Sequence, residues 1–218
     1  MYDYLRRMLE DGRLRPGDFV NMDGLARELG ISRTPLRDAL IQLEAEGFVV
    51  FFPRHGVMVA RLTLQDIKDF YQIIGALEST VVLQEGEKLS PDDVERMREL
   101  NARMKECIAA DDFDGYYARN LEFHNTYLFL TQNKKLIRTV LTYKQRLYDF
   151  PRRQKFIKEW EVASIGEHDQ LIELFARRDF EGASAFIRDV HWSFSRQERY
   201  IRRYYALEIY DLEGGEAP

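Results

Sequence analysis

The chain has 218 residues, enough for one large domain or two modest ones, and its composition is that of an ordinary globular protein. A single cysteine, Cys107, excludes an intrachain disulfide framework, and no apolar run approaches the roughly 20 residues that a membrane-spanning helix needs. The net charge of −5 argues against broad, sequence-independent binding to nucleic acid. We therefore expect a cytoplasmic protein with no membrane partner.

The charge is unevenly distributed along the chain. Residues 1–61 contain nine Arg, no Lys and nine Asp plus Glu, so this segment is neutral and the remainder carries the net −5. A segment with so few basic groups binds DNA weakly on its own. If this part of the chain binds DNA, two copies are therefore expected to be needed.

A first helix is predicted over residues 2–11, because Leu5, Met8 and Leu9 fall on one side and Asp11-Gly12 ends the pattern. A turn at Pro16-Gly17 follows.

Two short helices separated by a turn of about four residues are predicted next. Leu25, Ala26 and Leu29 form the apolar side of the first helix, Gly30 suits a left-handed helix end, and Ser32 suits the N-cap of the second. The second helix has an apolar stripe at positions i, i+3, i+4 and i+7, formed by Leu36, Ala39, Leu40 and Leu43. This is the outline of a helix-turn-helix.

Polar residues at the start of the second helix have the chemistry of a DNA-reading surface. Arg33, Thr34 and Arg37 lie off the apolar stripe, at the end that enters the major groove in helix-turn-helix proteins. Two guanidinium groups and a hydroxyl suit guanine edges and phosphate oxygens. The alternative interpretation is that the segment from Ser32 to Arg37 is simply a capped helix.

A two-stranded wing is predicted after Gly47. Residues 48–52 and 57–60 are apolar runs, and they flank a tip formed by Pro53, Arg54, His55 and Gly56. The fold class predicted for residues 1–62 is therefore a winged helix-turn-helix with a small β-hairpin wing.

Several motifs in this segment resemble the N-terminal domain of the GntR family of bacterial transcription regulators. They are Pro16-Gly17, LARELGISRTPLRDAL at 25–40, EGFV at 46–49 and PRHGVMV at 53–59. The resemblance covers about residues 1–62 and implies a dimeric regulator that reads a palindromic operator in double-stranded DNA, with the wing reaching the minor groove. By position it assigns base or phosphate contacts to Arg33, Thr34 and Arg37 and the wing tip to Gly56. We place Ser32, Arg54 and His55 beside them in the predicted DNA-binding site.

One residue departs from the family pattern. Asp23 stands where some relatives have a DNA-contacting Arg. The operator preference implied by the family is therefore open at this position.

Residues 63–212 are predicted to form an all-α bundle of about six helices, followed by a flexible tail at 213–218. Apolar residues recur at helical spacing throughout this part. The breaks between helices fall at residues 85–91, 109–114, 132–133, 150–153 and 178–182. The whole chain is thus predicted to be mainly α.

Three of the four histidines lie on the apolar stripes of different helices in this bundle: His124, His168 and His191. A single inward histidine is usually a hydrogen-bonded core residue, but three buried imidazoles need partners that one divalent metal ion supplies together. Zinc is our expectation, with nickel and iron as alternatives, because all three accept imidazole. Asn120, one turn before His124, offers a weak, uncharged fourth ligand.

The order Asn120-x3-His124, His168, His191 resembles the C-terminal ligand-binding domain of the FadR subfamily of GntR regulators, called FCD. This resemblance covers about residues 64–212. It implies one Asp and three His around a metal ion, with an effector, often a small carboxylate, completing the coordination. Asn120 stands where the Asp is expected, so metal binding should be weaker.

Lys144 is the main candidate for holding an anionic effector. It falls on an apolar stripe, where a charge needs a counter-ion that a carboxylate would supply, and Tyr143 and Arg146 flank it. The alternative is that Lys144 extends to solvent or pairs with a glutamate.

The favoured function is a homodimeric transcription regulator, a repressor and not an enzyme, whose operator affinity is controlled by a small carboxylate bound near the histidines. A metal-dependent hydrolase that uses the three histidines is one alternative, but it lacks a general base and leaves the helix-turn-helix unexplained. The other alternative is an effector-free architectural DNA-binding protein in which the histidines are core residues.

Overall fold

The computed structural model describes residues 1–148 and 157–209, so the predicted break at 150–153 and the predicted tail at 213–218 lie outside the described residues. Contacts divide the chain into two compact units. Among the described residues, the first unit is residues 1–63 with 144–148, and the second is residues 64–143 with 157–209. No helix in the described ranges is long and apolar enough to cross a membrane.

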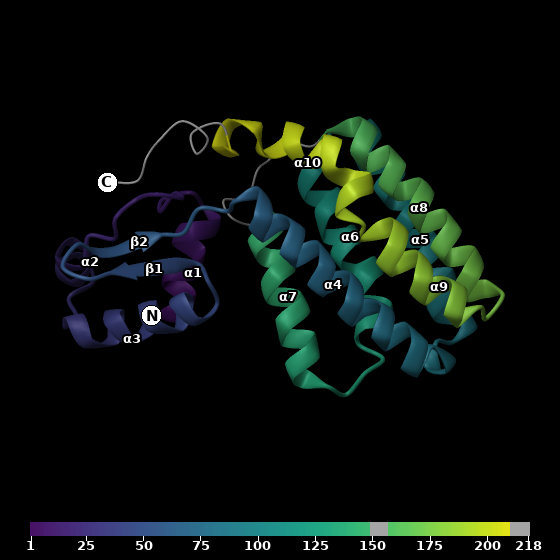
Figure 1. Cartoon of the computed structure of the whole chain (residues 1–218), viewed down its shortest axis with the longest axis horizontal. Helices are drawn as coiled ribbons and strands as arrows, with labels where there is room; N and C mark the ends of the chain where they lie inside the picture. Colours follow the sequence, from purple (N-terminus) through teal and green to yellow (C-terminus); the bar gives the residue numbers. More distant parts are fainter. Residues whose placement is uncertain (149–156, 210–218) are drawn as a thin grey trace. The chain divides into compact units, whose positions relative to one another are not determined.

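The first unit has the predicted winged helix-turn-helix architecture (Figure 1). Its elements are α1 (Tyr2–Glu10), α2 (Met22–Leu29), α3 (Arg33–Ala45), β1 (Val49–Phe52) and β2 (Gly56–Val59). One core joins α1, α3 and the inner side of the hairpin, and it includes Leu5, Leu9, Leu36, Leu40, Leu43, Phe48 and Val59.

The helix-turn-helix is built by local signals. Asn21 caps α2 by accepting a hydrogen bond of 2.9 Å from the backbone N–H of Gly24, and α2 ends at Gly30 with φ of 63°, as predicted. The predicted stripe of α3 is at most 4% exposed, so α3 presents its opposite side outward. Ser32 holds the predicted N-cap position, but its side chain makes no capping hydrogen bond. That part of the prediction was wrong, and the Ser32 hydroxyl is not used in starting α3.

The hairpin register places the basic residues at the wing tip. Val49 pairs with Val59 and Phe52 with Gly56, which leaves residues 53–55 as the loop. Gly56 has φ of 101° and Arg54 has φ of 68°. A left-handed conformation costs a non-glycine residue about 1 kcal/mol, so Arg54 is held at the tip against its own backbone preference.

The second unit is helical throughout its described residues, which confirms the predicted all-α bundle (Figure 1). The elements from residue 64 onward are α4 (Leu64–Glu85), the 3-10 turn η1 (Gly86–Lys88), α5 (Pro91–Ala109), α6 (Phe113–Leu128), α7 (Lys134–Tyr148), α8 (Lys158–Ala176), α9 (Phe180–Phe186), the π-helical turn η2 (Ile187–His191) and α10 (Phe194–Ile209). Contacts group residues 144–148 of α7 with the first unit. Helix α5 packs on α6 and α8, and α4 packs on α9 and η2. The His-bearing elements α6, α8 and η2 therefore belong to one bundle.

The predicted breaks before α5, α6, α7 and α9 are confirmed, and the break between α9 and α10 was missed. The missed break follows the π-helical turn, in which helical spacing of apolar residues continues without interruption. Gly75 lets α4 approach this turn closely, because a Cβ built there would lie 2.8 Å from the Cβ of Trp192.

Candidate DNA-reading surface and metal centre

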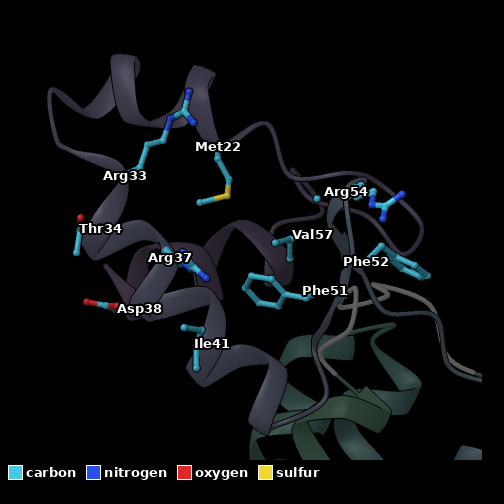
Figure 2. A pocket seen from close by; sticks show the side chains of 11 residues that line it. Met22, Arg33, Thr34, Arg37, Asp38, Ile41, Phe51, Phe52, Arg54 and Val57 are labelled. Atoms are coloured by element: carbon cyan, nitrogen blue, oxygen red, sulfur yellow. The ribbon is translucent and has the colours of Figure 1, made fainter.

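An open groove lies between α3 and the wing in the first unit (Figure 2). Its lining consists of Met22, Arg33, Thr34, Arg37, Asp38, Ile41, Phe51, Phe52, Arg54, Gly56 and Val57. Three of these residues are arginines and one is an aspartate, so the groove is positively charged although residues 1–61 are neutral as a whole. Positive charge in an open groove suits a phosphate backbone and guanine edges.

The structure brings together most of the predicted DNA-binding residues. Arg33, Thr34 and Arg37 are exposed at the start of α3, and Arg54 and Gly56 are exposed at the wing. Ser32 and His55 are also exposed, but they do not line this groove.

Arg33 differs from the other groove arginines because it forms an ion pair. Its Nη2 contacts Oδ1 of Asp23 on α2, and Figure 2 shows its side chain extending away from Thr34 and Arg37. The Arg33 and Asp23 side chains are 70% and 56% exposed. Water and DNA therefore have access to both charges.

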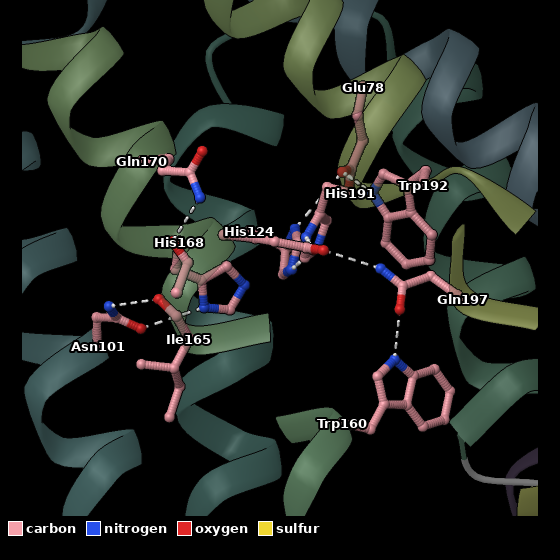
Figure 3. Close-up of polar contacts among 12 residues, drawn as sticks. Glu78, Asn101, His124, Trp160, Ile165, His168, Gln170, His191, Trp192 and Gln197 are labelled. Atoms are coloured by element: carbon pink, nitrogen blue, oxygen red, sulfur yellow. Dashed lines mark hydrogen bonds and ion pairs between the residues drawn. The ribbon is translucent and has the colours of Figure 1, made fainter. Parts of the chain in front are cut away.

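Three histidines meet inside the second unit and are called the His cluster below (Figure 3). They are His124 on α6, His168 on α8 and His191 at the end of η2. His124 is 2% exposed, His168 is fully buried, and the side chain of His191 is 9% exposed. One ring nitrogen from each lies within 4.8 Å of the others, and the Nε2 atoms of His124 and His191 are 3.3 Å apart.

The hydrogen bonds of His124 place a proton on Nδ1. The hydroxyl of Tyr127 donates its only proton to Oε2 of Glu78 at 2.8 Å. The hydroxyl oxygen of Tyr127 lies 2.6 Å from Nδ1 of His124, so it accepts a hydrogen bond from that nitrogen. Trp192 also donates to Glu78 at 2.8 Å, so this fully buried carboxylate on α4 anchors the arrangement.

His168 is protonated on Nδ1 as well. The amide nitrogen of Asn101 donates to the carbonyl of Ile165 at 3.2 Å and to Asp169 at 2.6 Å. This orients the amide oxygen of Asn101 toward Nδ1 of His168, 3.2 Å away, where it accepts a hydrogen bond.

His191 has a carboxylate behind it. Oε2 of Glu167 lies 2.8 Å from Nδ1 of His191 and accepts a hydrogen bond from it. The other carboxylate oxygen accepts a hydrogen bond of 3.0 Å from Gln197, whose own oxygen accepts one of 2.9 Å from Trp160 (Figure 3). Together these hydrogen bonds orient the His191 ring, the Glu167 carboxylate and the Gln197 amide.

In a neutral ring, a proton on Nδ1 leaves a lone pair on Nε2. The Nε2 atoms of His124 and His191 face each other at 3.3 Å, a separation that either a proton on one of them or a bound cation bridges. Two imidazole nitrogens bound about 2.1 Å from one tetrahedral zinc ion lie roughly 3.4 Å apart. In a histidine that binds a metal ion through one ring nitrogen, the N–H group of the other nitrogen usually donates a hydrogen bond to an oxygen. Each ring of the His cluster has such an oxygen beside its Nδ1 atom. The residues present therefore fit a divalent metal.

Asn120 fits the role of a fourth group. It is 8% exposed and lies one helical turn before His124 on α6, and its buried side-chain oxygen has no hydrogen-bond partner in the described part of the chain. Buried amide oxygens normally have a donor or an ion as partner.

Comparison with protein families decides the identity of both halves. Residues 1–59 match the bacterial regulatory proteins of the gntR family, and residues 69–191 match the FCD domain. The chain belongs to the GntR family. It is a DNA-binding transcriptional regulator with an FCD domain and not an enzyme, so the hydrolase alternative is set aside.

Individual relatives agree with this assignment. The chain is 28% identical over 177 residues to a protein of Aminobacter aminovorans named Nta operon transcriptional regulator, covering 79% of this chain and 80% of that one. It is 24% identical over 188 residues to the uncharacterized HTH-type regulator YdhC of Bacillus subtilis, covering 85% and 84% of the two chains. The structure of E. coli McbR/YncC matches with a TM-score of 0.64 and 20% identity over 98% of this chain and 96% of that one, a likeness in fold.

Several residues of this GntR regulator that surround the His cluster were missed by sequence reasoning: Glu78, Asn101, Tyr127 and Glu167. Glu78 carried a signal, because it continues the inward stripe of Ile67, Tyr71 and Ile74 on α4. Glu167 directly precedes His168 and follows no stripe, so only the folded structure reveals its contact with His191.

The predicted effector residues are divided between the units. Lys144 is 1% exposed and Arg146 is 8% exposed, and contacts group both with the first unit, although the predicted boundaries placed them in the second. Tyr143 belongs to the second unit and stacks on Phe70 with ring centres 4.7 Å apart. Their role in effector binding stays a prediction.

Proposed function

We propose that this GntR regulator is a homodimeric repressor of a palindromic operator, and that a small carboxylate bound at a zinc ion in the His cluster releases it from DNA. The observation that carries the proposal is the convergence of three imidazole rings in a buried interior, with one ring nitrogen of each within 4.8 Å of the others. The oxygen behind each Nδ1 atom leaves Nε2 of a neutral ring directed away from its hydrogen-bond partner, as in histidines that bind a metal.

His124, His168 and His191 would hold the metal, with Asn120 as a weak fourth group. The metal would supply a Lewis-acid centre at which a carboxylate oxygen binds. Imidazole and amide ligands are uncharged, so the positive charge of the metal stays available to an anionic effector. A small carboxylate therefore suits this centre better than a neutral metabolite of the same size.

Repression would act through the spacing of the two winged helix-turn-helix units in the dimer. Each α3 would enter the major groove at one half-site, and the half-site spacing must match the spacing of the two units in the dimer. An effector that favours a different spacing would lower operator affinity by a coupling of about 1–3 kcal/mol, a factor of 5–150.

Metal content and ligand binding test the proposal. The protein, purified without a polyhistidine tag, should contain about one equivalent of divalent metal by elemental analysis. His168→Ala should lower this content, whereas His55→Ala, which removes the one histidine outside the cluster, should leave it unchanged. Full metal occupancy in His168→Ala would overturn the metal centre.

A melting-point screen separates the repressor from an effector-free architectural protein. A ligand that binds only the folded chain raises its melting temperature. At least one small carboxylate should do so in the zinc-loaded protein, should lose this effect with EDTA, and should weaken operator binding in a gel shift. An operator complex that no carboxylate perturbs would favour the architectural alternative.

A further inference from the structure

The ion pair between Asp23 and Arg33 lies at the surface expected to face DNA. Arg33 is the first residue of α3, and Asp23 lies in the first turn of α2. Their contact crosses the helix-turn-helix, and both side chains are more than half exposed. An exposed ion pair adds little to stability, so its main consequence is the direction that it gives to the guanidinium group.

The other groove arginines lack such a partner. In the described part of the chain neither Arg37 nor Arg54 forms an ion pair, although both line the groove that Arg33 lines. Among the groove arginines of the described structure, Arg33 therefore differs in having a paired carboxylate before it meets DNA.

A carboxylate beside a guanidinium changes what that guanidinium binds. Arginine has five N–H donors in a rigid plane, so a carboxylate at one edge fixes the plane and leaves another edge free. The negative charge repels a phosphate group but not the neutral N7 and O6 acceptors of guanine, which match two parallel N–H donors. The pair therefore favours a base edge over the DNA backbone.

We propose that Asp23 is a specificity-determining residue that commits Arg33 to a guanine in each operator half-site. This inference rests on the proposed sequence-specific operator binding and deepens it. Asp23 touches no base in this role. It positions Arg33 and excludes phosphate from it.

The test compares discrimination with overall affinity. An operator is first selected from random duplexes with the full-length wild-type protein, and each half-site guanine is then replaced in turn. Asp23→Asn should lose about 5- to 150-fold of discrimination at one guanine in each half-site, the range expected for a good bidentate contact. Its affinity for random DNA should stay equal or rise, because one negative charge is removed.

Glu28→Gln provides the matched control, because Glu28 is an exposed acid on the same helix and forms no ion pair in the described structure. It should shift affinity for all duplexes alike and keep discrimination at every position. Arg33→Lys should lose the same guanine preference as Asp23→Asn, since lysine lacks the planar fork.

Two outcomes have distinct meanings. If Asp23→Asn and Glu28→Gln both raise affinity uniformly with discrimination intact, Asp23 only neutralises charge and this inference is overturned. If the wild-type protein selects no operator at all, the proposed operator binding fails instead.

Discussion

Replacing Glu167 with glutamine tests the metal centre through a residue that does not itself ligate. The two oxygens of Glu167 accept from Nδ1 of His191 at 2.8 Å and from Gln197 at 3.0 Å. A glutamine offers one acceptor where the network needs two. Gln197 cannot reverse its amide without losing the hydrogen bond that Trp160 donates to its oxygen at 2.9 Å. In the variant, the new amide N–H group therefore faces the N–H group of either His191 or Gln197. The negative charge behind His191 is also removed.

The expected loss of metal affinity follows from the known effect of removing a residue that hydrogen-bonds to a metal ligand. Loss of such a partner weakens metal binding by about 10- to 100-fold. At a free metal concentration about 1,000 times the wild-type Kd, bound metal stabilises the folded state by roughly 4.1 kcal/mol, and the weaker site keeps only about 2.7 to 1.4 kcal/mol of this. For a chain of this length the difference is roughly 3 to 10 °C in melting temperature.

Two measurements separate the metal effect from simple destabilisation. Competition with a coloured chelator gives the metal affinity of the folded protein, and melting temperatures with and without EDTA isolate the part of the stability that depends on metal. Glu173→Gln is the control, because Glu173 is an exposed acid on the same helix, and its ion pair in the described structure is with Arg98 at the surface. Equal metal affinity in wild type, Glu167→Gln and Glu173→Gln would refute the assignment of His191 as a ligand.

Three further perturbations probe other parts of the chain. Arg37→Ala should weaken operator binding at least about fivefold and lower the salt dependence of binding by about one phosphate contact, measured by gel shift at several salt concentrations. Gly75→Ala should cost about 1–3 kcal/mol in denaturant unfolding, because the new Cβ would lie 2.8 Å from Cβ of Trp192. Burial raises the pKa of Glu161 from 4.5 to about 7 against an opposing hydrogen bond from Tyr116, so the folded state holds more protons than the unfolded chain in this interval. Stability should therefore fall as the pH rises from 4.5 to about 7, and Glu161→Gln should flatten this dependence.

Each of these has its own control. Arg98→Ala removes an arginine from the second unit and should leave operator affinity unchanged. Gly166→Ala, where a Cβ meets nothing within 4 Å, should stabilise α8 by about 1 kcal/mol, the opposite sign to Gly75→Ala. A wild-type unfolding free energy that is constant between pH 4.5 and 7 would contradict the raised pKa of Glu161.

The winged helix-turn-helix of the first unit was predictable because its structure is set by residues close in sequence. Gly30 ends α2 and the stripe of α3 fits one face, and both signals span less than three helical turns. The hairpin pairs residues at most ten positions apart. The one wrong detail, the capping bond of Ser32, concerns a hydroxyl whose partner depends on the geometry around the helix start.

The His cluster was predictable only as three inward residues, and its surroundings were not. Periodicity shows which face of a helix is buried but not which residue of another helix it meets. The contacts of Glu78 with Tyr127 and of Asn101 with His168 cross 49 and 67 residues of sequence. The same limit applies to Lys144, whose burial was expected but whose grouping with the first unit depends on long-range contacts.

The replacement of the expected aspartate by Asn120 has a different meaning once these contacts are known. From the sequence, the loss of one carboxylate predicts weaker metal binding. The structure places Glu167 directly behind His191, and Glu78 behind His124 with its carboxylate 3.5 Å from Nδ1. Negative charge one ligand away still raises the basicity of an imidazole and still attracts a cation in a low-dielectric interior. The proposed centre thus combines uncharged ligands, which leave the charge of the metal to an anionic effector, with carboxylates behind them that help to retain the metal.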